Sequence, residues 1–165
     1  MIIAVVATIT IPLFTARSPQ RVQQEFVDAL NGLTRFAWTS AVTQRKVHRI
    51  FFDFDKDFVR VEQQKRDEFV PVSGAYLTTS YRWPSQAFQF RNFYIGPQDN
   101  MQAGQGAATV WFFINEQGIS QPVVINIYNQ VSSDSTEDAQ PFSLVLNPFL
   151  AQFKLYEEFQ EPPVA

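Results

Sequence analysis

Residues 18–46 read SPQRVQQEFVDALNGLTRFAWTSAVTQRK, and this pattern predicts one long amphipathic helix. Ser18 is a typical helix N-cap, and Pro19 suits the first helical position because no backbone N–H is needed there. Apolar residues then recur at spacings of three and four, which forms one stripe on a helix: Val22, Phe26, Leu30, Leu33, Phe36 with Ala37, and Ala41. Arg45 and Lys46 lie where cations favour a helix C-terminus. We predict a helix from residue 19 to about residue 46, roughly 40 Å long.

An apolar segment precedes this helix. Residues 1–16 contain no charge, and Arg17 is the first charged residue. As a helix they would span roughly 24 Å, whereas a membrane core of about 30 Å takes about 20 residues. No basic region precedes the segment and no small-x-small site follows it, so a cleavable signal peptide fits poorly. We expect residues 1–18 to be the C-terminal part of a truncated membrane anchor, kinked or interrupted at Pro12 and Pro19.

After the helix the apolar pattern changes to a period of two. Ile50, Phe52 and Phe54 alternate with Arg49, Phe51 and Asp53, as on a strand. Further predicted strands are residues 58–62, 69–72, 77–82, 88–95, 109–115, 122–128, 142–146 and 153–157. Gly118 in INEQGIS marks a hairpin turn with a left-handed residue. One helix followed by many strands predicts an α+β fold with a β-rich domain at residues 47–158 and a flexible or extended tail at 159–165.

Composition narrows the function classes. The 165 residues suit one domain beside the apolar segment, and 17 phenylalanines favour a packed body over disorder. The net charge of −3, without a basic stripe, gives no reason to expect a nucleic-acid partner. The absence of cysteine removes disulfides and thiolate metal ligands.

Acidic residues form two candidate calcium sites, and each can also be explained without a metal ion. Asp53, Asp55 and Asp57 imitate the start of an EF-hand loop, but Phe58 and Gln64 occupy its glycine and glutamate positions. A charged hairpin turn is the better interpretation there. In the later polar loop, carboxylates could ligate calcium or could simply be solvated: Asp134, Glu137 and Asp138.

Other candidate sites carry little support. His48 is the single histidine, so a zinc site or a Cys-His pair is excluded and a Ser-His-Asp triad could be drawn only through it. The GQG at residues 104–106 leads into a strand rather than a helix, unlike a phosphate loop. Trp38, Trp83 and Trp111 are interpreted as core or interface residues. We therefore predict no catalytic, metal or cofactor site and no enzymatic activity.

Several quoted stretches together resemble the type IV pilin and pseudopilin superfamily, and especially the H-type minor pseudopilin and its minor type IV pilin counterparts. TITIPLF (residues 8–14) resembles the end of a pilin anchor. Residues 26–55 resemble that subfamily's passage from helix to first strand. FFINEQGISQPVVINI (112–127) resembles its glycine-turn hairpin, and LNPFLAQFKLYE (146–157) its closing strand.

The sequence also departs from the family pattern. The prepilin-peptidase glycine and the glutamate near the start of the mature anchor are absent. We expect an upstream reading frame to supply them, with a basic leader and about ten apolar residues that complete the span. The final hairpin has Phe149, Leu150 and Ala151 where the family has Thr-Gly, and residues 68–105 carry no family motif.

The resemblance implies a pilin-like fold and a structural function. It implies a minor pseudopilin of a type II secretion pseudopilus, which assembles with other pseudopilins or pilins through its N-terminal helix. It implies a single-pass protein of the bacterial inner membrane with its globular domain in the periplasm, and no small-molecule substrate. Two alternatives stay open: a minor type IV pilus pilin, and a membrane-tethered extracytoplasmic binding module. A tethered hydrolase has the least support.

Overall fold

A computed structural model describes residues 18–74, 78–101, 106–131 and 139–162, and its first element is helix α2, Pro19–Gln44. The predicted cap is confirmed, because the Ser18 side chain accepts a hydrogen bond from the Arg21 N–H. The helix ends two residues before the predicted residue 46. Arg45 adopts a left-handed conformation (φ 51°) and its N–H donates to the Ala41 carbonyl, which closes the last turn without a glycine.

In the described residues ten strands follow and form two antiparallel sheets. Sheet A contains β1 (His48–Asp53), β2 (Phe58–Lys65), β3 (Glu68–Pro71), β4 (Ser80–Arg82) and β7 (Thr109–Ile114). Sheet B contains β5 (Phe88–Ile95), β6 (Gln98–Asp99), β8 (Val123–Asn129), β9 (Gln140–Asn147) and β10 (Gln152–Tyr156). The chain thus visits sheet A, sheet B, sheet A and sheet B in turn. Each predicted strand is present, and only the two-residue β6 was not predicted.

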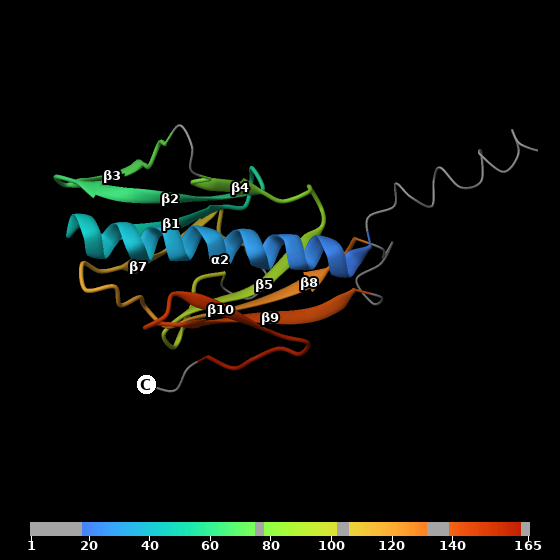
Figure 1. Cartoon of the computed structure of the whole chain (residues 1–165). Helices are drawn as coiled ribbons and strands as arrows, with labels where there is room; N and C mark the ends of the chain where they lie inside the picture. Colours follow the sequence, from blue (N-terminus) through green and yellow to red (C-terminus); the bar gives the residue numbers. More distant parts are fainter. Residues whose placement is uncertain (1–17, 75–77, 102–105, 132–138, 163–165) are drawn as a thin grey trace, which may run out of the picture.

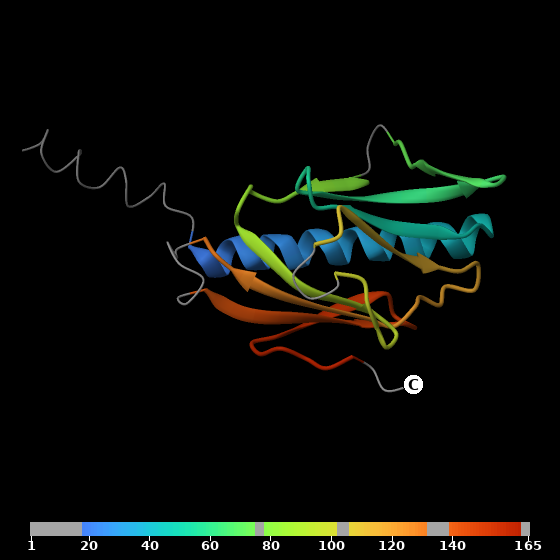
Figure 2. The same ribbon diagram turned by 180° about the vertical axis from the view of Figure 1, so that it is seen from behind.

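The helix lies along the seam between the two sheets (Figure 1). It contacts β1, β2, β4 and β7 of sheet A and β10 of sheet B. Seen from behind, sheet A lies on one side of the helix and sheet B on the other (Figure 2). The predicted α+β arrangement of a long N-terminal helix on antiparallel sheets is confirmed.

The apolar stripe of α2 forms the centre of the core. Phe26 is fully buried, and its ring centroid lies 4.9 Å from that of Phe88 and 5.7 Å from that of Trp83. Fully burying such a side chain is worth about 1.5–3 kcal/mol. Every predicted stripe residue is buried except Phe36, which is only half-buried at the margin.

Aromatic pairs connect the inner faces of the sheets. Phe52 of β1 lies 5.1 Å from Phe93 of β5, centroid to centroid. A β-bulge between Phe90 and Asn92 shifts the alternation of β5 by one residue. Because of this extra residue, Phe88 and Phe93 are both buried although they are an odd number of residues apart.

The outer face of sheet B is covered by the C-terminal segment. Gln160 is held there by Asn126 of β8, which accepts from its N–H (3.2 Å) and donates to its carbonyl (3.0 Å). The Phe159 ring packs edge-on against Tyr128, with centroids 4.9 Å apart. Within the predicted tail, Phe159 and Gln160 are therefore held against sheet B, and residues 163–165 lie outside the described residues.

No helix in the described part of the chain is long and apolar enough to cross a membrane. The predicted anchor, residues 1–18, falls almost entirely outside the described residues. Its role therefore stays a prediction.

Candidate functional site

Two asparagines fasten α2 to sheet B. Asn31, beside the apolar stripe, binds both backbone groups of Phe153 on the edge strand β10: its Oδ1 accepts from the N–H at 2.7 Å and its Nδ2 donates to the carbonyl at 3.2 Å. Asn129, at the end of β8, donates to the Pro19 carbonyl at 2.9 Å. The first and middle turns of the helix are thus tied to the sheet by polar contacts as well as by the core.

The outer face of sheet A carries a group of arginines and aromatic rings, here called the Arg49 cluster. It consists of Arg49, Phe51, Arg60, Glu62, Phe69 and Trp111. The Arg49 guanidinium lies 4.5 Å from the ring centroid of Phe69 and 5.0 Å from that of Trp111. Cations placed over aromatic faces in this way are attracted by the ring quadrupole.

Glu62 is the buried anion of this cluster. Its side chain is 1% exposed, and its two oxygens accept from Nε of Arg49 at 2.5 Å and Nε of Arg60 at 2.7 Å. Both arginines are partly exposed, so they screen the carboxylate from water while remaining solvated themselves. The cluster is a satisfied ion-pair network.

His48 faces the core and is fully buried. Its Nδ1 lies 2.9 Å from the Lys46 carbonyl, and its Nε2 has no hydrogen-bond partner in the described part of the structure. Burial lowers the pKa of His48 and outweighs the hydrogen bond with the Lys46 carbonyl, which raises it, so the imidazole is neutral near pH 7. A buried, neutral ring with this contact is a core residue rather than part of a triad.

The aspartates after β1 form a turn, as predicted. Asp53 Oδ1 accepts from the Lys56 N–H at 3.0 Å, and Asp57 takes a left-handed conformation with φ 55°. Among the described residues, no three His, Cys, Asp or Glu side chains lie together as a metal site. The second calcium candidate lies outside those residues, namely Asp134, Glu137 and Asp138, and so does most of the GQG segment.

The three tryptophans occupy different environments. Trp83 is buried among core aromatics, with its ring 5.4 Å from that of Phe90. Trp38 is half-buried against the turn at Gly118. Trp111 is 39% exposed and stacks on Phe51 at 6.2 Å.

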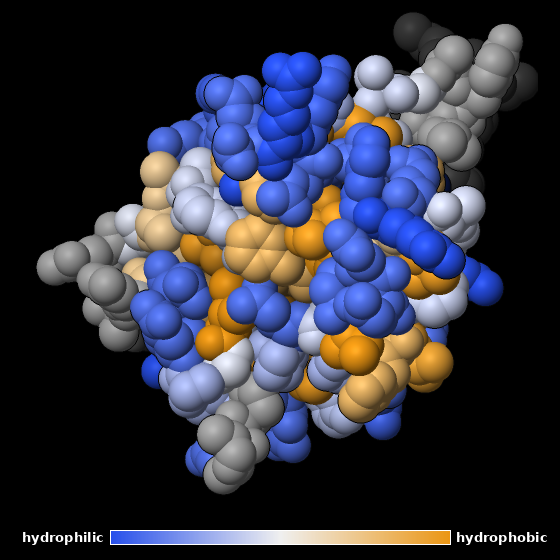
Figure 3. Space-filling model, turned by 90° about the vertical axis from the view of Figure 1, so that its left-hand side faces the viewer, coloured by the Kyte–Doolittle hydropathy of each residue, from blue (hydrophilic) through white to orange (hydrophobic). Residues whose placement is uncertain are grey.

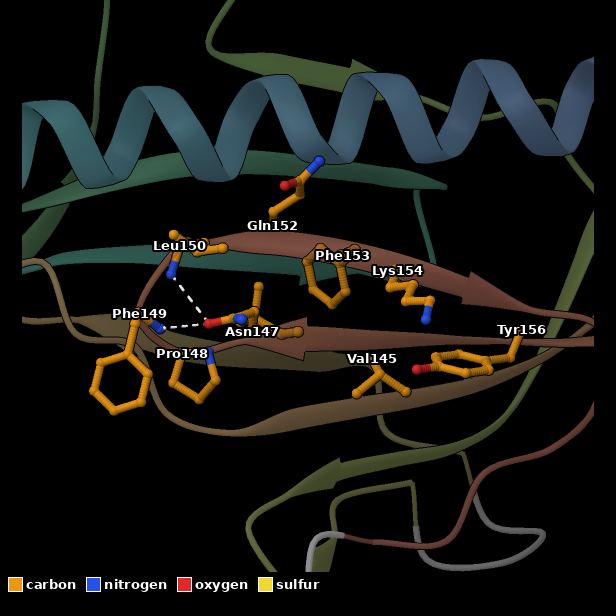
Figure 4. A pocket seen from close by; sticks show the side chains of 10 residues that line it. Val145, Asn147, Pro148, Phe149, Leu150, Gln152, Phe153, Lys154 and Tyr156 are labelled. Atoms are coloured by element: carbon orange, nitrogen blue, oxygen red, sulfur yellow. Dashed lines mark hydrogen bonds between the residues drawn. The ribbon is translucent and has the colours of Figure 1, made fainter.

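A second surface feature lies at the β9–β10 turn. Phe149 and Leu150 project into solvent, 69% and 65% exposed. Asn147 Oδ1 accepts from both of their N–H groups, at 3.0 and 3.2 Å, which holds the turn in place (Figure 4). Ala151 completes the turn with φ 48°, so the strand pair closes without the glycine usual in the family.

Neither of these surface features was predicted. Alternation did place Arg49 and Phe51 on one face of β1, but only the pairing of β1 with β2 and β7 brings Glu62 and Trp111 beside them. In the sequence, the turn was marked only by Phe149, Leu150 and Ala151 in place of the Thr-Gly of pilin-like proteins. In the sequence, Asn31 was distinguished only by its polar side chain next to the apolar stripe, so its contact with Phe153 was not predicted.

A long N-terminal helix on two antiparallel sheets defines a pilin-like fold. The structure is similar to two solved structures of one pilin-like protein, the minor pseudopilin EpsH from the type 2 secretion system of Vibrio cholerae. One has a TM-score of 0.60 and 13% identity, covering 88% of this chain and 100% of the other. The second has a TM-score of 0.55 and 11% identity, covering 81% and 94%. No protein-family model and no curated protein sequence matches the chain.

Proposed function

We propose that this protein is a non-enzymatic minor pseudopilin of a type II secretion system. In this proposal residues 1–18 belong to an inner-membrane anchor, the β-rich domain lies in the periplasm, and the protein assembles with other pilin-like subunits through its N-terminal helix. The observation that carries the proposal is the fold shared with EpsH, a minor pseudopilin, over 88% of this chain.

The placement of α2 supports assembly through the helix. Its N-terminal end, where the apolar residues join, lies at one end of the domain, and Asn129 fixes Pro19 there (Figure 1). Residues 2–14 carry no charge. Leaving apolar surface in water costs about 25 cal/mol per Å². Such a segment therefore requires lipid or neighbouring apolar helices.

The residues of the domain support a structural rather than a catalytic role. The single histidine is buried, neutral and hydrogen-bonded to backbone. Among the described carboxylates the most buried is Glu62, and two arginines bind both of its oxygens. Groups that satisfy one another in this way are not free to act on a substrate.

Deletion of the gene in its own organism tests the proposal. We expect enzymes that normally reach the medium to accumulate in the periplasm, type IV pili to form normally, and the full-length gene to restore secretion. Lost pili with intact secretion would instead favour the minor type IV pilin. If neither process changes and the purified domain captures a ligand, the tethered binding module is correct.

A further inference from the structure

Exposed apolar side chains gather in the half of the molecule that lies away from Pro19, beside α2 from Gly32 to Val42. Four of the five large apolar side chains exposed in the described residues belong to this group, here called the distal patch: Val42, Ile119, Phe149 and Leu150. The fifth, Trp111, belongs to the Arg49 cluster. Figure 3 views the molecule from this side and shows apolar groups set among hydrophilic ones.

Contacts join the parts of the distal patch into one surface. The turn at Gly118 packs so closely on the last turns of α2 that a Cβ there would lie 2.6 Å from Trp38 Nε1 and 2.9 Å from Val42 Cγ2. The Ser120 N–H donates to the Pro148 carbonyl at 2.9 Å, which links the same hairpin to the β9–β10 turn. Three elements distant in sequence thus hold the patch in a fixed shape.

Phe149 and Leu150 form a ridge between two hollows. One hollow, of about 600 Å³, lies along β9 and β10 and ends near Tyr156 (Figure 4). The other, of about 430 Å³, lies between the turn and the exposed side of α2 at Gly32 and Trp38. A ridge flanked by hollows offers an apolar anchor and two places for a partner's side chains, as at the centre of a protein interface.

The charged residues that line the two hollows have one sign. Lys154 is the charged residue that lines the first hollow, and Arg35 is the charged residue that lines the second. No carboxylate lines either hollow, and α2 contains no acidic residue after Asp28. Electrostatic complementarity therefore favours an apolar partner segment that carries carboxylates.

We infer that the distal patch docks an apolar, carboxylate-bearing segment of the neighbouring pilin-like subunit on the side away from the membrane. The inference rests on the proposed function, which places Pro19 towards the membrane and the patch away from it. A second copy in a symmetric pair would bring Arg35 and Lys154 against their own equivalents, which is unfavourable. The chain's own C-terminal segment lies elsewhere, bound to Asn126 on sheet B.

Site-specific photo-cross-linking in the full chain tests the contact. Leu150 is replaced by benzoyl-phenylalanine in cells that also make the pilin-like proteins encoded beside this gene, and the same replacement of Trp111 is the matched control. We expect a Leu150 adduct with one of those proteins, at a yield about tenfold above that from Trp111. Adding Arg35→Glu is expected to lower the Leu150 yield severalfold, because it reverses the charge in the second hollow.

Co-purification separates failure of this inference from failure of the proposed function. The double variant Phe149→Ser, Leu150→Ser should keep the unfolding temperature of the parent, since both side chains are exposed, yet bind the adduct partner about tenfold more weakly. The inference is wrong if the double variant binds those proteins as well as the parent chain does, or if the adduct contains only a second copy of this chain. In both cases co-purification of the parent chain with those proteins leaves the proposed function standing. If the parent chain binds none of them, both are overturned.

Discussion

Single residues in this protein are stabilised by pairings that cross between strands. Glu62 illustrates this: its carboxylate is buried on the outer face of a sheet, where side chains are ordinarily solvated, because two arginines and the rings of the Arg49 cluster cover it. Removing the anion would leave Arg49 and Arg60 close together without their shared counterion.

We expect Glu62→Gln to lower the free energy of unfolding by about 1–3 kcal/mol, less than for a fully buried pair because both arginines reach solvent. Denaturant unfolding of residues 17–165 measures the change. Glu68→Gln on the exposed β3 is the control, with an expected change within about 0.5 kcal/mol. Equal effects of the two substitutions would show that the cluster contributes no stability.

His48 should make stability depend on pH. Burial lowers its pKa in the folded state below the usual 6.5, so the unfolded state binds more protons between these two pKa values. Its contribution to stability is therefore complete above pH 6.5 and is lost as the pH falls from 6.5 through the folded pKa.

The unfolding temperature should accordingly fall below pH 6.5 in the parent and fall less steeply in His48→Asn, whose amide can still donate to the Lys46 carbonyl. Thermal unfolding of both proteins at a series of pH values between about 8 and 5 compares the slopes. Parallel slopes in the two proteins would mean that His48 is not the titrating group.

At the scale of elements, the helix is positioned by its apolar stripe and by Asn31. We expect Asn31→Ala to cost about 1–2 kcal/mol, because it leaves the N–H and carbonyl of Phe153 without their partner in a half-buried place. Gln24→Ala, which removes an exposed contact with Asp28 on the same helix, is the matched control and should change stability by less than about 0.5 kcal/mol. Hydrogen exchange of the Phe153 amide should also become faster in Asn31→Ala alone, and an unchanged rate would contradict the role given to Asn31.

Local pattern predicted most elements of the fold, because each depends on residues near it in the chain. The cap at Ser18, the stripe of α2, the alternation of β1 and the left-handed Gly118 (φ 77°) all follow from short-range chemistry. Phe36 was predicted to be buried but is only half-buried. Spacing shows that a residue lies on the apolar side of the helix, but only the packing of the sheets decides whether a residue at the margin of that side is covered.

Features that depend on long-range pairing were not predictable in this way. The bulge in β5 breaks the alternation that would otherwise turn Phe93 outward. The burial of Asn126 on the outer side of β8 depends on the distant C-terminal segment, whose Gln160 it binds. The Arg49 cluster and the distal patch each combine three or more elements, so no single stretch of sequence reveals them.

At the scale of the whole molecule, the domain has two unlike halves. The Pro19 end receives the apolar N-terminal residues, and the distal patch lies in the other half of the domain, with Lys154 and Arg35 lining its hollows. Head-to-tail association requires two different surfaces of a subunit to bind its neighbours, whereas a symmetric pair uses the same surface twice. This polarity agrees with the proposed place of the protein in a pseudopilus.

The central claim is that the domain folds without residues 1–16 but assembles only with them. The most direct test compares full-length protein with residues 17–165 in co-purification from detergent-solubilised membranes that contain the pilin-like proteins of the same operon. We predict that the shortened form is soluble and unfolds cooperatively. It should retain little or no binding to the pilin-like proteins, because the apolar helix supplies most of the surface buried between subunits, at about 25 cal/mol per Å². Equal binding by both forms, or binding by neither while the shortened domain turns over a substrate, would contradict the account.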